Sequence, residues 1–254
     1  MTSDLARKVV LITGASTGIG AAAARGFAAA GSKVVVHYNA SHEAAEAVVA
    51  RIRADGGIAD AVHGDVTEIA AVRRIVADTM ALHGRIDVLV NNAGGMVGRV
   101  RIEDYTEAVL QQVLALNVMQ VALFMREVVP VMRTQRSGNV INVTSIAARL
   151  GGGPGAVLYA GAKGFIATAT RGWAKELVAD GIRVNAVSPG VIATPFHDRY
   201  STAEQLTAMR NTIPMNRLGT ADDCVGTFLY LASDAQSGYV TGQNIEVNGG
   251  QYMA

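Results

Sequence analysis

The stretch KVVLITGASTGIG, residues 8–20, decides the fold. Its first part, KVVLIT, is a short β-branched run typical of a buried strand. Three glycines follow, Gly14, Gly18 and Gly20, and then an alanine-rich segment predicted as a helix. A glycine turn between strand and helix lets backbone N–H groups and the helix N-terminus face a phosphate without obstruction by Cβ atoms. The alternative interpretation is a tight turn that serves only helix packing.

The rest of the chain repeats this alternation of apolar runs and helical segments. Continuous apolar runs are expected of parallel strands covered on both faces, and their alternation with helices indicates βαβ units. No linker divides the chain. We therefore expect an α/β, single-domain Rossmann fold over residues 1–254, a doubly wound parallel sheet of about seven strands with helices on both faces. The predicted strands are 8–13, 33–38, 86–94, 139–145, 182–190 and 244–248, and the predicted helices are 18–30, 42–54, 68–83, 107–135, 158–180 and 221–233.

Composition excludes several classes of protein. The 254 residues are 50% hydrophobic and 17% charged, below the roughly 25% charged of average domains, which favours an extensive core and buried subunit contacts. A net charge of +1 without a basic block argues against nucleic-acid binding. The longest uncharged run, 108–125, contains polar amides and is poor material for a membrane span. The single cysteine, Cys224, is expected in the core, and without a signal sequence we expect a cytoplasmic protein.

The end of the second predicted strand bears on the choice of cofactor. NAD-preferring Rossmann sites place Asp or Glu about 20 residues beyond the glycines, where it accepts a hydrogen bond from the ribose 2′-hydroxyl. Here Tyr38, Asn39 and Ser41 occupy that region, and the first carboxylate is Glu43. An acid would repel a 2′-phosphate, so its absence permits NADP(H). We expect NADP(H) to be preferred, with NAD(H) possible.

Tyr159 and Lys163 form a candidate acid–base pair. They lie four residues apart in a predicted helix, so both side chains project from one face. A neighbouring ammonium favours the phenolate and lowers the tyrosine pKa, and such a pair can exchange a proton with a carbonyl or hydroxyl oxygen. The spacing alone is also compatible with two surface residues.

Other polar residues follow or separate the predicted strands. Ser145 ends the predicted strand 139–145 at the carboxyl edge of the sheet, where ligands bind in open α/β sheets. Asn117 lies in an otherwise apolar helix and needs a buried partner. The turn 91–94 and the segment 189–194 follow two further strands. Each has an interpretation as turn chemistry or core hydrogen bonding, but together they favour one site.

The Thr-Gly-x-x-x-Gly-x-Gly spacing at 13–20 and the Tyr-x-x-x-Lys pair resemble the short-chain dehydrogenase/reductase family, and the resemblance covers the chain from Lys8 onward. It implies a tetrad of Asn117, Ser145, Tyr159 and Lys163. Tyr159 would be the acid–base, and Lys163 would hold the nicotinamide ribose and depress the tyrosine pKa. Ser145 would bind the substrate oxygen, and Asn117 would anchor a water that connects Lys163 to solvent.

The resemblance also implies the cofactor contacts and the assembly. Asp65 and Val66 would hold the adenine, Thr194 and the backbone near Ile192 the nicotinamide carboxamide. Thr17 departs from the family because many NADP-preferring relatives have a basic residue there. A homotetramer is implied, built through the helices 107–135 and 158–180. The full expected set is Gly14, Ser16, Thr17, Gly18, Ile19, Gly20, Tyr38, Asn39, Ser41, Asp65, Val66, Asn91, Ala93, Gly94, Tyr159, Lys163, Pro189, Gly190, Ile192 and Thr194.

The substrate stays open among sugars or polyols, small ketones and 3-oxoacyl thioesters. Residues 195–216 occupy the position of the family's substrate lid, but could equally form a packed amphipathic helix. The C-terminal segment resembles those of 3-oxoacyl-carrier-protein reductases and bacterial sugar dehydrogenases. Pro130 departs from the former, which often have a basic docking residue there, although Lys175 keeps a second basic position. The segment from Ser145 to Tyr159 is also one residue longer than expected of them.

The prediction is an oxidoreductase that interconverts a small-molecule carbonyl and a secondary alcohol. The main alternative is a regulatory or scaffold protein that binds the cofactor with little or no turnover. The complete tetrad argues against it, because a sensor needs only the glycine turn. A nucleotide-sugar epimerase is disfavoured by the glycine spacing and the lack of room for a second domain. No metal is expected, since the five histidines show no ligand spacing.

Overall fold

The computed structural model describes residues 4–253, and their strands form a seven-stranded sheet in the order β3-β2-β1-β4-β5-β6-β7. Every neighbouring pair is parallel. The order reverses between β1 and β4, and ligands of such sheets bind at the carboxyl ends of the strands beside that reversal. The strands are β1 (Val9–Ile12), β2 (Lys33–Tyr38), β3 (Ile58–His63), β4 (Val88–Asn91), β5 (Gly138–Val143), β6 (Ile182–Pro189) and β7 (Asn244–Val247).

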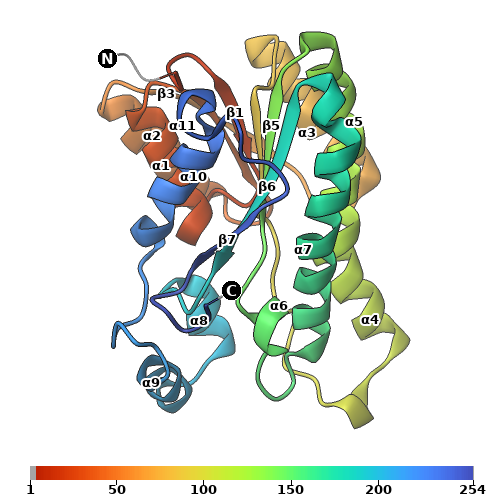
Figure 1. The fold of residues 1–254 in the computed structure, drawn as a ribbon, viewed down its shortest axis with the longest axis vertical. Coiled ribbons are helices and arrows are strands. Elements are labelled where there is room, and N and C mark those ends of the chain that lie inside the picture. Colours follow the sequence, from red (N-terminus) through yellow and green to blue (C-terminus); the bar gives the residue numbers. More distant parts are fainter. Residues whose placement is uncertain (1–3, 254) are drawn as a thin grey trace.

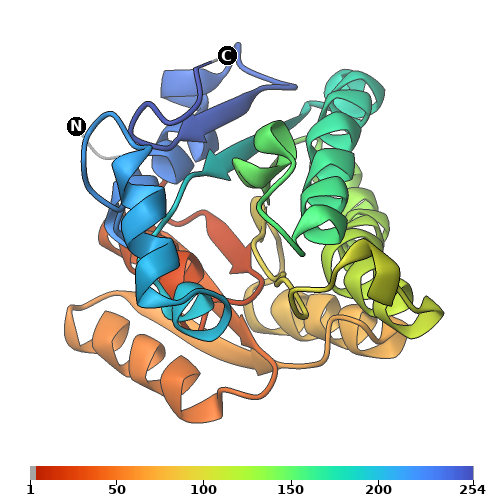
Figure 2. The same cartoon turned by 90° about the horizontal axis from the view of Figure 1, so that it is seen from below.

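Helices cover both faces of the sheet (Figure 2). On one face α1 (Gly18–Ala29), α2 (His42–Ala54) and α10 (Val225–Ala232) enclose a core that includes Phe27 and Phe228. On the other, α3 (Ile69–His83), α5 (Gln120–Gln135) and α7 (Val157–Leu177) enclose a second core that includes Phe124 and Met132. Continuous burial of β1, β4 and β6 follows from this double cover.

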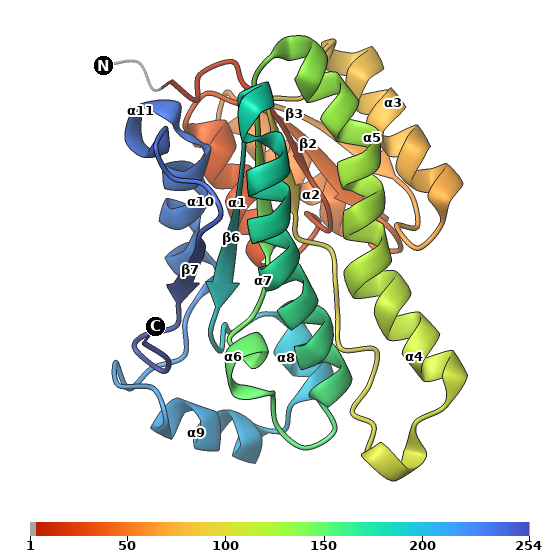
Figure 3. The same ribbon diagram turned by 45° about the vertical axis from the view of Figure 1, so that its right-hand side comes forward.

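Short elements gather at the carboxyl ends of the strands, below the sheet in Figure 1 and Figure 3. They comprise α4 (Glu107–Leu114), a π-helical turn η2 (Ala115–Met119), α6 (Ala147–Leu150), α8 (Pro195–Tyr200) and α9 (Ala203–Asn211). Three of them, α6, α8 and α9, contribute residues to the lining of the cavity described below, together with the first turns of α7. The remaining short helices are η1 (Ile102–Asp104), η3 (Val178–Asp180), η4 (Ala221–Cys224) and α11 (Asp234–Ser237).

The predicted α/β architecture is confirmed, with differences at particular elements. Strand β3 is not among the predicted strands, because Asp60 and His63 interrupt its apolar pattern. The helix predicted over 107–135 is interrupted by the π-helical turn η2. That stretch, Glu107–Gln135, has the length and apolar composition to cross a membrane, which is weak evidence because core helices of soluble proteins share both features.

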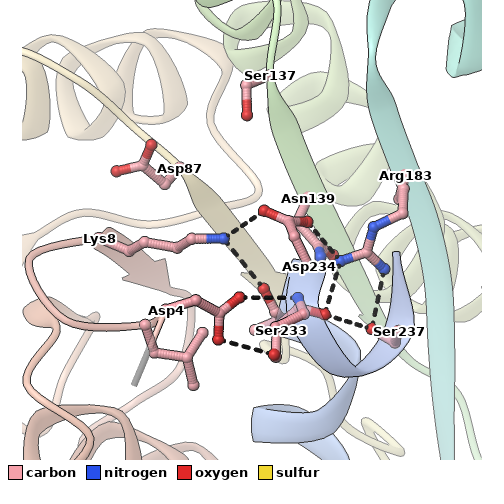
Figure 4. Close-up of polar contacts among 12 residues, drawn as sticks. Asp4, Lys8, Asp87, Ser137, Asn139, Arg183, Ser233, Asp234 and Ser237 are labelled. Carbon is pink, nitrogen blue, oxygen red and sulfur yellow. Dashed lines mark hydrogen bonds and ion pairs between the residues drawn. The ribbon is translucent and has the colours of Figure 1, made fainter. Parts of the chain in front are cut away.

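A polar network closes the opposite end of the sheet (Figure 4). Asp234 accepts hydrogen bonds from Lys8 Nζ at 2.7 Å and from Arg183 Nη2 at 2.9 Å. Asp4 accepts from Ser233 Oγ at 2.8 Å. These contacts tie the start of the chain and α11 to β6. They stabilise the amino-terminal end of the sheet, opposite to the end where α6, α8 and α9 lie.

Candidate active site

The turn between β1 and α1 is a cradle built from glycine. Gly14 and Gly18 have φ of +63° and +56°, in the left-handed region that favours glycine. A Cβ on Gly20 would lie 2.5 Å from Asn92 Nδ2, so a side chain there has no space. The first turn of α1 contains no acidic residue and its cap, Thr17, makes no side-chain cap bond. The free N–H groups and the helix dipole therefore suit a phosphate group.

Asn92 holds this cradle to the end of β4. Its Nδ2 donates to the carbonyl oxygens of Thr13 at 2.8 Å and Gly14 at 2.9 Å. The backbone N–H groups of Asn92 and Ala93 both donate to Thr13 Oγ1 at 2.9 Å. The side chain of the predicted residue, Asn91, turns into the interior and bonds with Asn142. The Asn-Asn-Ala-Gly turn predicts a functional asparagine here, but the sequence does not show that Asn92 faces the glycine turn and Asn91 the interior.

His37 is a second residue that the sequence analysis missed. Its ring is 1% exposed, its Nδ1 accepts from Gly14 N at 3.0 Å, and its Nε2 donates to Gly64 O at 2.9 Å. Burial lowers the pKa of His37, so the ring is neutral at pH 7. A neutral ring with the proton on Nε2 satisfies both contacts. His37 thus fixes the glycine turn to the ends of β2 and β3.

The residues predicted for the adenosine end meet beside β2 and β3. Asn39 hydrogen-bonds with Asp65, and Tyr38 Oη lies 2.8 Å from His42 Nδ1. Hydrogen bonds from the hydroxyl and the backbone of Thr67 hold the pKa of Asp65 below its usual value. The end of β2 itself has no carboxylate, since Asp65 follows β3. Ser41 lies at the N-cap of α2, and Val66 is buried.

Ser145, Tyr159 and Lys163 converge at the end of β5. Ser145 follows that strand, and the other two project from α7. Tyr159 and Ser145 share a hydrogen bond. Lys163 Nζ donates to the carbonyl of Val143 at 2.8 Å and lies 5.8 Å from the centre of the Tyr159 ring. The predicted grouping of these three side chains is therefore present in the structure.

The sequence analysis predicts a lowered pKa for Tyr159, and the folded protein shifts this pKa in the opposite direction. Burial raises the pKa of Tyr159 to about 12, although the hydrogen bond from Ser145 opposes the rise. Burial also lowers the pKa of Lys163 to about 8. Both shifts have the same cause, because removing a charged group from water disfavours its charged form. The phenol is thus held neutral, the form that can donate a proton.

Asn117 lies within the π-helical turn η2 and is fully buried. Its Nδ2 donates to the carbonyls of Gly95 at 2.9 Å and Val113 at 3.0 Å, and its Oδ1 accepts from Gly95 N at 3.0 Å. The expected buried partner is thus the turn after β4. A Cβ on Gly94 would lie 2.9 Å from Asn117 Oδ1 and 3.1 Å from Lys163 Nζ, so these groups lie close together. π-Helical turns are frequent at functional sites.

A cavity of about 640 Å³ joins the glycine cradle to this group. It includes residues predicted for the cofactor as well as members of the tetrad. Its lining includes Gly14, Thr17, Gly18, Ile19, Gly94, Ser145, Tyr159, Lys163, Pro189, Gly190, Ile192 and Thr194. Ser16, Gly20, Tyr38, Asn39, Ser41, Asp65, Val66, Asn91, Ala93 and Asn117 do not line it. An elongated ligand therefore has room from the cradle to Tyr159, and the residues beside β2 and β3 lie beyond that cavity.

The segment 195–216 covers the cavity with two short helices, α8 and α9. Phe196 lines the cavity and its ring centre lies 5.8 Å from that of Tyr159. His197 and Met209 line it too. Met215, near the end of the segment, is 67% exposed and does not line the cavity. The part of the segment that covers the cavity is thus α8 with one side of α9.

Comparisons with known proteins agree with this geometry. A family model described as Enoyl-(Acyl carrier protein) reductase matches residues 14–251. A 3-oxoacyl-(acyl-carrier-protein) reductase of Synechocystis sp. is 42% identical over 253 residues, which are 98% of this chain and 98% of the relative. The chain belongs to the short-chain dehydrogenase/reductase family of oxidoreductases.

Solved structures extend the likeness. NADH-dependent reductase A1-R′, responsible for alginate metabolism and crystallised with NAD, has a TM-score of 0.89 and 36% identity over 100% of both chains. A putative NAD(P)-dependent gluconate 5-dehydrogenase from Beutenbergia cavernae, with bound NADP, has a TM-score of 0.90 and 32% identity over 97% of both chains. Relatives of similar fold thus bind either nicotinamide cofactor.

Proposed function

We propose that the protein transfers hydride between NADP(H) and a substrate that cycles between a carbonyl and a secondary alcohol, with Tyr159 as the acid–base. The observation that carries the proposal is the meeting of Ser145, Tyr159 and Lys163 in the same cavity as the glycine cradle. A protein that only bound the cofactor would need the cradle alone. The nicotinamide, when bound, supplies or accepts the hydride.

The side chains divide the remaining work. In the direction of reduction, the neutral Tyr159 phenol donates its proton to the carbonyl oxygen as the alcohol forms. Ser145 hydrogen-bonds that oxygen and keeps it in line with the phenol. Lys163 holds the nicotinamide ribose and stabilises the phenolate that the transfer leaves behind. Asn117 anchors the water that connects Lys163 to solvent, and the α8–α9 lid excludes other water from the reacting atoms.

NADP(H) is the preferred cofactor, and NAD(H) is accepted. The support is the end of β2, where Tyr38, Asn39 and Ser41 can donate to a phosphate or to a hydroxyl and no carboxylate repels the phosphate. Asp65 lies nearby, but it is engaged by Asn39 and Thr67.

We expect Tyr38→Asp to shift preference toward NAD(H), because a carboxylate there accepts from the ribose 2′-hydroxyl and repels a 2′-phosphate. The ratio of kcat/KM for NADPH to that for NADH should fall by about 10-fold to 100-fold, the value of one or two charged hydrogen bonds. Tyr38→Phe is the matched control for loss of the hydroxyl. An unchanged ratio in Tyr38→Asp would contradict this placement of the 2′ position.

A homotetramer is the expected assembly. Apolar side chains lie exposed along α4, η2, α7 and the start of η3, where a neighbouring subunit would cover them. On the predicted interface helix 158–180, Phe165 and Val178 are exposed, whereas Leu177 is buried in its own subunit and Trp173 is partly buried against the same core. The exposed set includes Leu110, Leu114, Met119, Val157, Phe165 and Val178.

The function is tested by titrating purified protein with NADPH and NADH separately and then assaying ketones, sugars and 3-oxoacyl thioesters by nicotinamide absorbance. We expect tighter binding of NADPH and turnover of one substrate class. Tight cofactor binding with no turnover of any class would favour the regulatory alternative. Failure to bind either cofactor would contradict the proposed site itself.

A further inference from the structure

The charged residues of the cavity are all basic. Among residues 4–253, Arg99, Lys163 and His197 line it, and no Asp or Glu does. Lys163 donates to Val143 O and is assigned to the cofactor ribose in the proposed function. Burial, followed by the positive charge of Arg99, lowers the pKa of His197, so this ring is neutral at pH 7. Arg99 is therefore the one cation of the lining left for a substrate.

Arg99 has no acidic partner among residues 4–253. Its Nε donates to the carbonyl of Tyr200 and its Nη1 to the carbonyl of Pro154, both at 3.0 Å. Its Nη2 makes no hydrogen bond to the described residues. Two other arginines near the site have acidic partners, Arg101 with Glu103 at 3.9 Å and Arg149 with Glu246 at 2.9 Å.

We infer that the substrate carries a carboxylate and that Arg99 binds it; the inference rests on the proposed function and names its substrate class. A guanidinium is a rigid planar donor suited to a carboxylate, and two carbonyl contacts already fix its orientation. Arg99 is partly buried and has no counter-ion, so an anionic ligand in the cavity can form a charge-assisted hydrogen bond with it. Sugar acids and oxo or hydroxy acids fit this description. Neutral sugars and thioesters do not.

The two carbonyl contacts also give Arg99 a second role, which the test must separate. They join the loop after β4 to the loop before α7 and to α8, so Arg99 also holds the lid to the body. Loss of such a contact slows all substrates by a similar factor. Loss of a carboxylate ligand slows acids selectively. The discriminating quantity is thus the ratio of kcat/KM for an acid to that for its neutral counterpart.

The experiment compares two matched pairs of substrates in the full-length protein. Acetoacetate and methyl acetoacetate share a 3-oxo group, and D-gluconate and D-glucitol share a carbon chain. We expect at least one acid to exceed its neutral partner by about 10-fold to 100-fold in kcat/KM, the value of a charged hydrogen bond. Arg99→Gln should bring this ratio close to one, mainly by raising KM for the acid, and Arg99→Lys should keep part of the preference for the acid. Arg101→Gln removes a neighbouring arginine outside the cavity and should leave the ratio as it is.

A binding measurement keeps the inference testable without turnover. Protein saturated with NADP⁺ cannot reduce acetoacetate, so calorimetry of this dead-end complex reports affinity alone. Tighter binding of acetoacetate than of its methyl ester, lost in Arg99→Gln, supports the carboxylate site even if no carbonyl is reduced. The inference is overturned if neither acid is preferred in kinetics or binding. It is also overturned if an acetoacetyl thioester is preferred over both acids, or if Arg99→Gln slows acid and ester equally.

Discussion

Replacing Tyr159 with phenylalanine is expected to lower kcat by about 10²-fold to 10⁴-fold, the usual contribution of a positioned general acid or base. The variant keeps the ring that packs 5.8 Å from Phe196 and removes only the hydroxyl that hydrogen-bonds Ser145. The lid contact and the glycine cradle stay in place. The Kd for NADPH should therefore change by less than about threefold, while single-turnover hydride transfer is nearly abolished.

Two comparisons make this expectation specific. Tyr239→Phe removes the hydroxyl group of a fully exposed tyrosine and should leave kcat as it is. Ser145→Ala removes the partner of the Tyr159 hydroxyl and should reduce kcat by less than Tyr159→Phe does. Retention of a tenth or more of wild-type turnover in Tyr159→Phe would show that another group transfers the proton.

The fold could be predicted because its sheet is buried on both sides. Strands such as β1 and β6 need side chains that are apolar on both faces, which makes them continuous in sequence. Strand β3 lies at the sheet edge, where Asp60 and His63 are tolerated because solvent reaches them, and its pattern is correspondingly weak. The π-helical turn η2 has no periodic signal of its own, since it differs from an α-helix by one residue of register.

Parts of the site depend on contacts that no spacing encodes. Tyr159 and Lys163 share a helix face, and Ser145 ends a strand, so local rules suffice for them. His37 acts through Gly14 and Gly64, which are close only because β1, β2 and β3 are neighbours.

Arg99 likewise acquires its place only when the loop after β4, the loop before α7 and the helix α8 meet. The raised pKa of Tyr159 follows from burial, a property of the folded chain, and helix spacing alone suggested the opposite direction.

Lys163→Met is expected to separate function from stability. Methionine keeps the length and apolar stem of the side chain but cannot donate to the nicotinamide ribose or stabilise a phenolate. We expect kcat to fall by about 10²-fold or more and NADPH to bind about 10-fold more weakly. Loss of rate alone, with the Kd for NADPH unchanged, would contradict the assigned ribose contact.

The same variant should show a characteristic dependence of stability on pH. The folded-state pKa of Lys163, about 8, lies below its ordinary value of 10.5. Burial of the ammonium therefore destabilises the wild type by about 3 kcal/mol below pH 8, at 1.36 kcal/mol per pKa unit. This penalty decreases as the pH rises through 8 and vanishes above about 10.5.

The methionine variant never carries this penalty, although it leaves Val143 O without its donor. The free energy of unfolding of Lys163→Met, relative to wild type, should thus fall by about 2–3 kcal/mol between pH 7 and pH 10.5. The Tyr159 phenol stays protonated in the folded state up to that pH, because burial raises its pKa to about 12 and loss of the Lys163 ammonium does not lower it, so its titration cancels in the difference. Denaturant titrations across that range measure it, and a difference independent of pH would mean that the Lys163 ammonium is not desolvated in the folded protein.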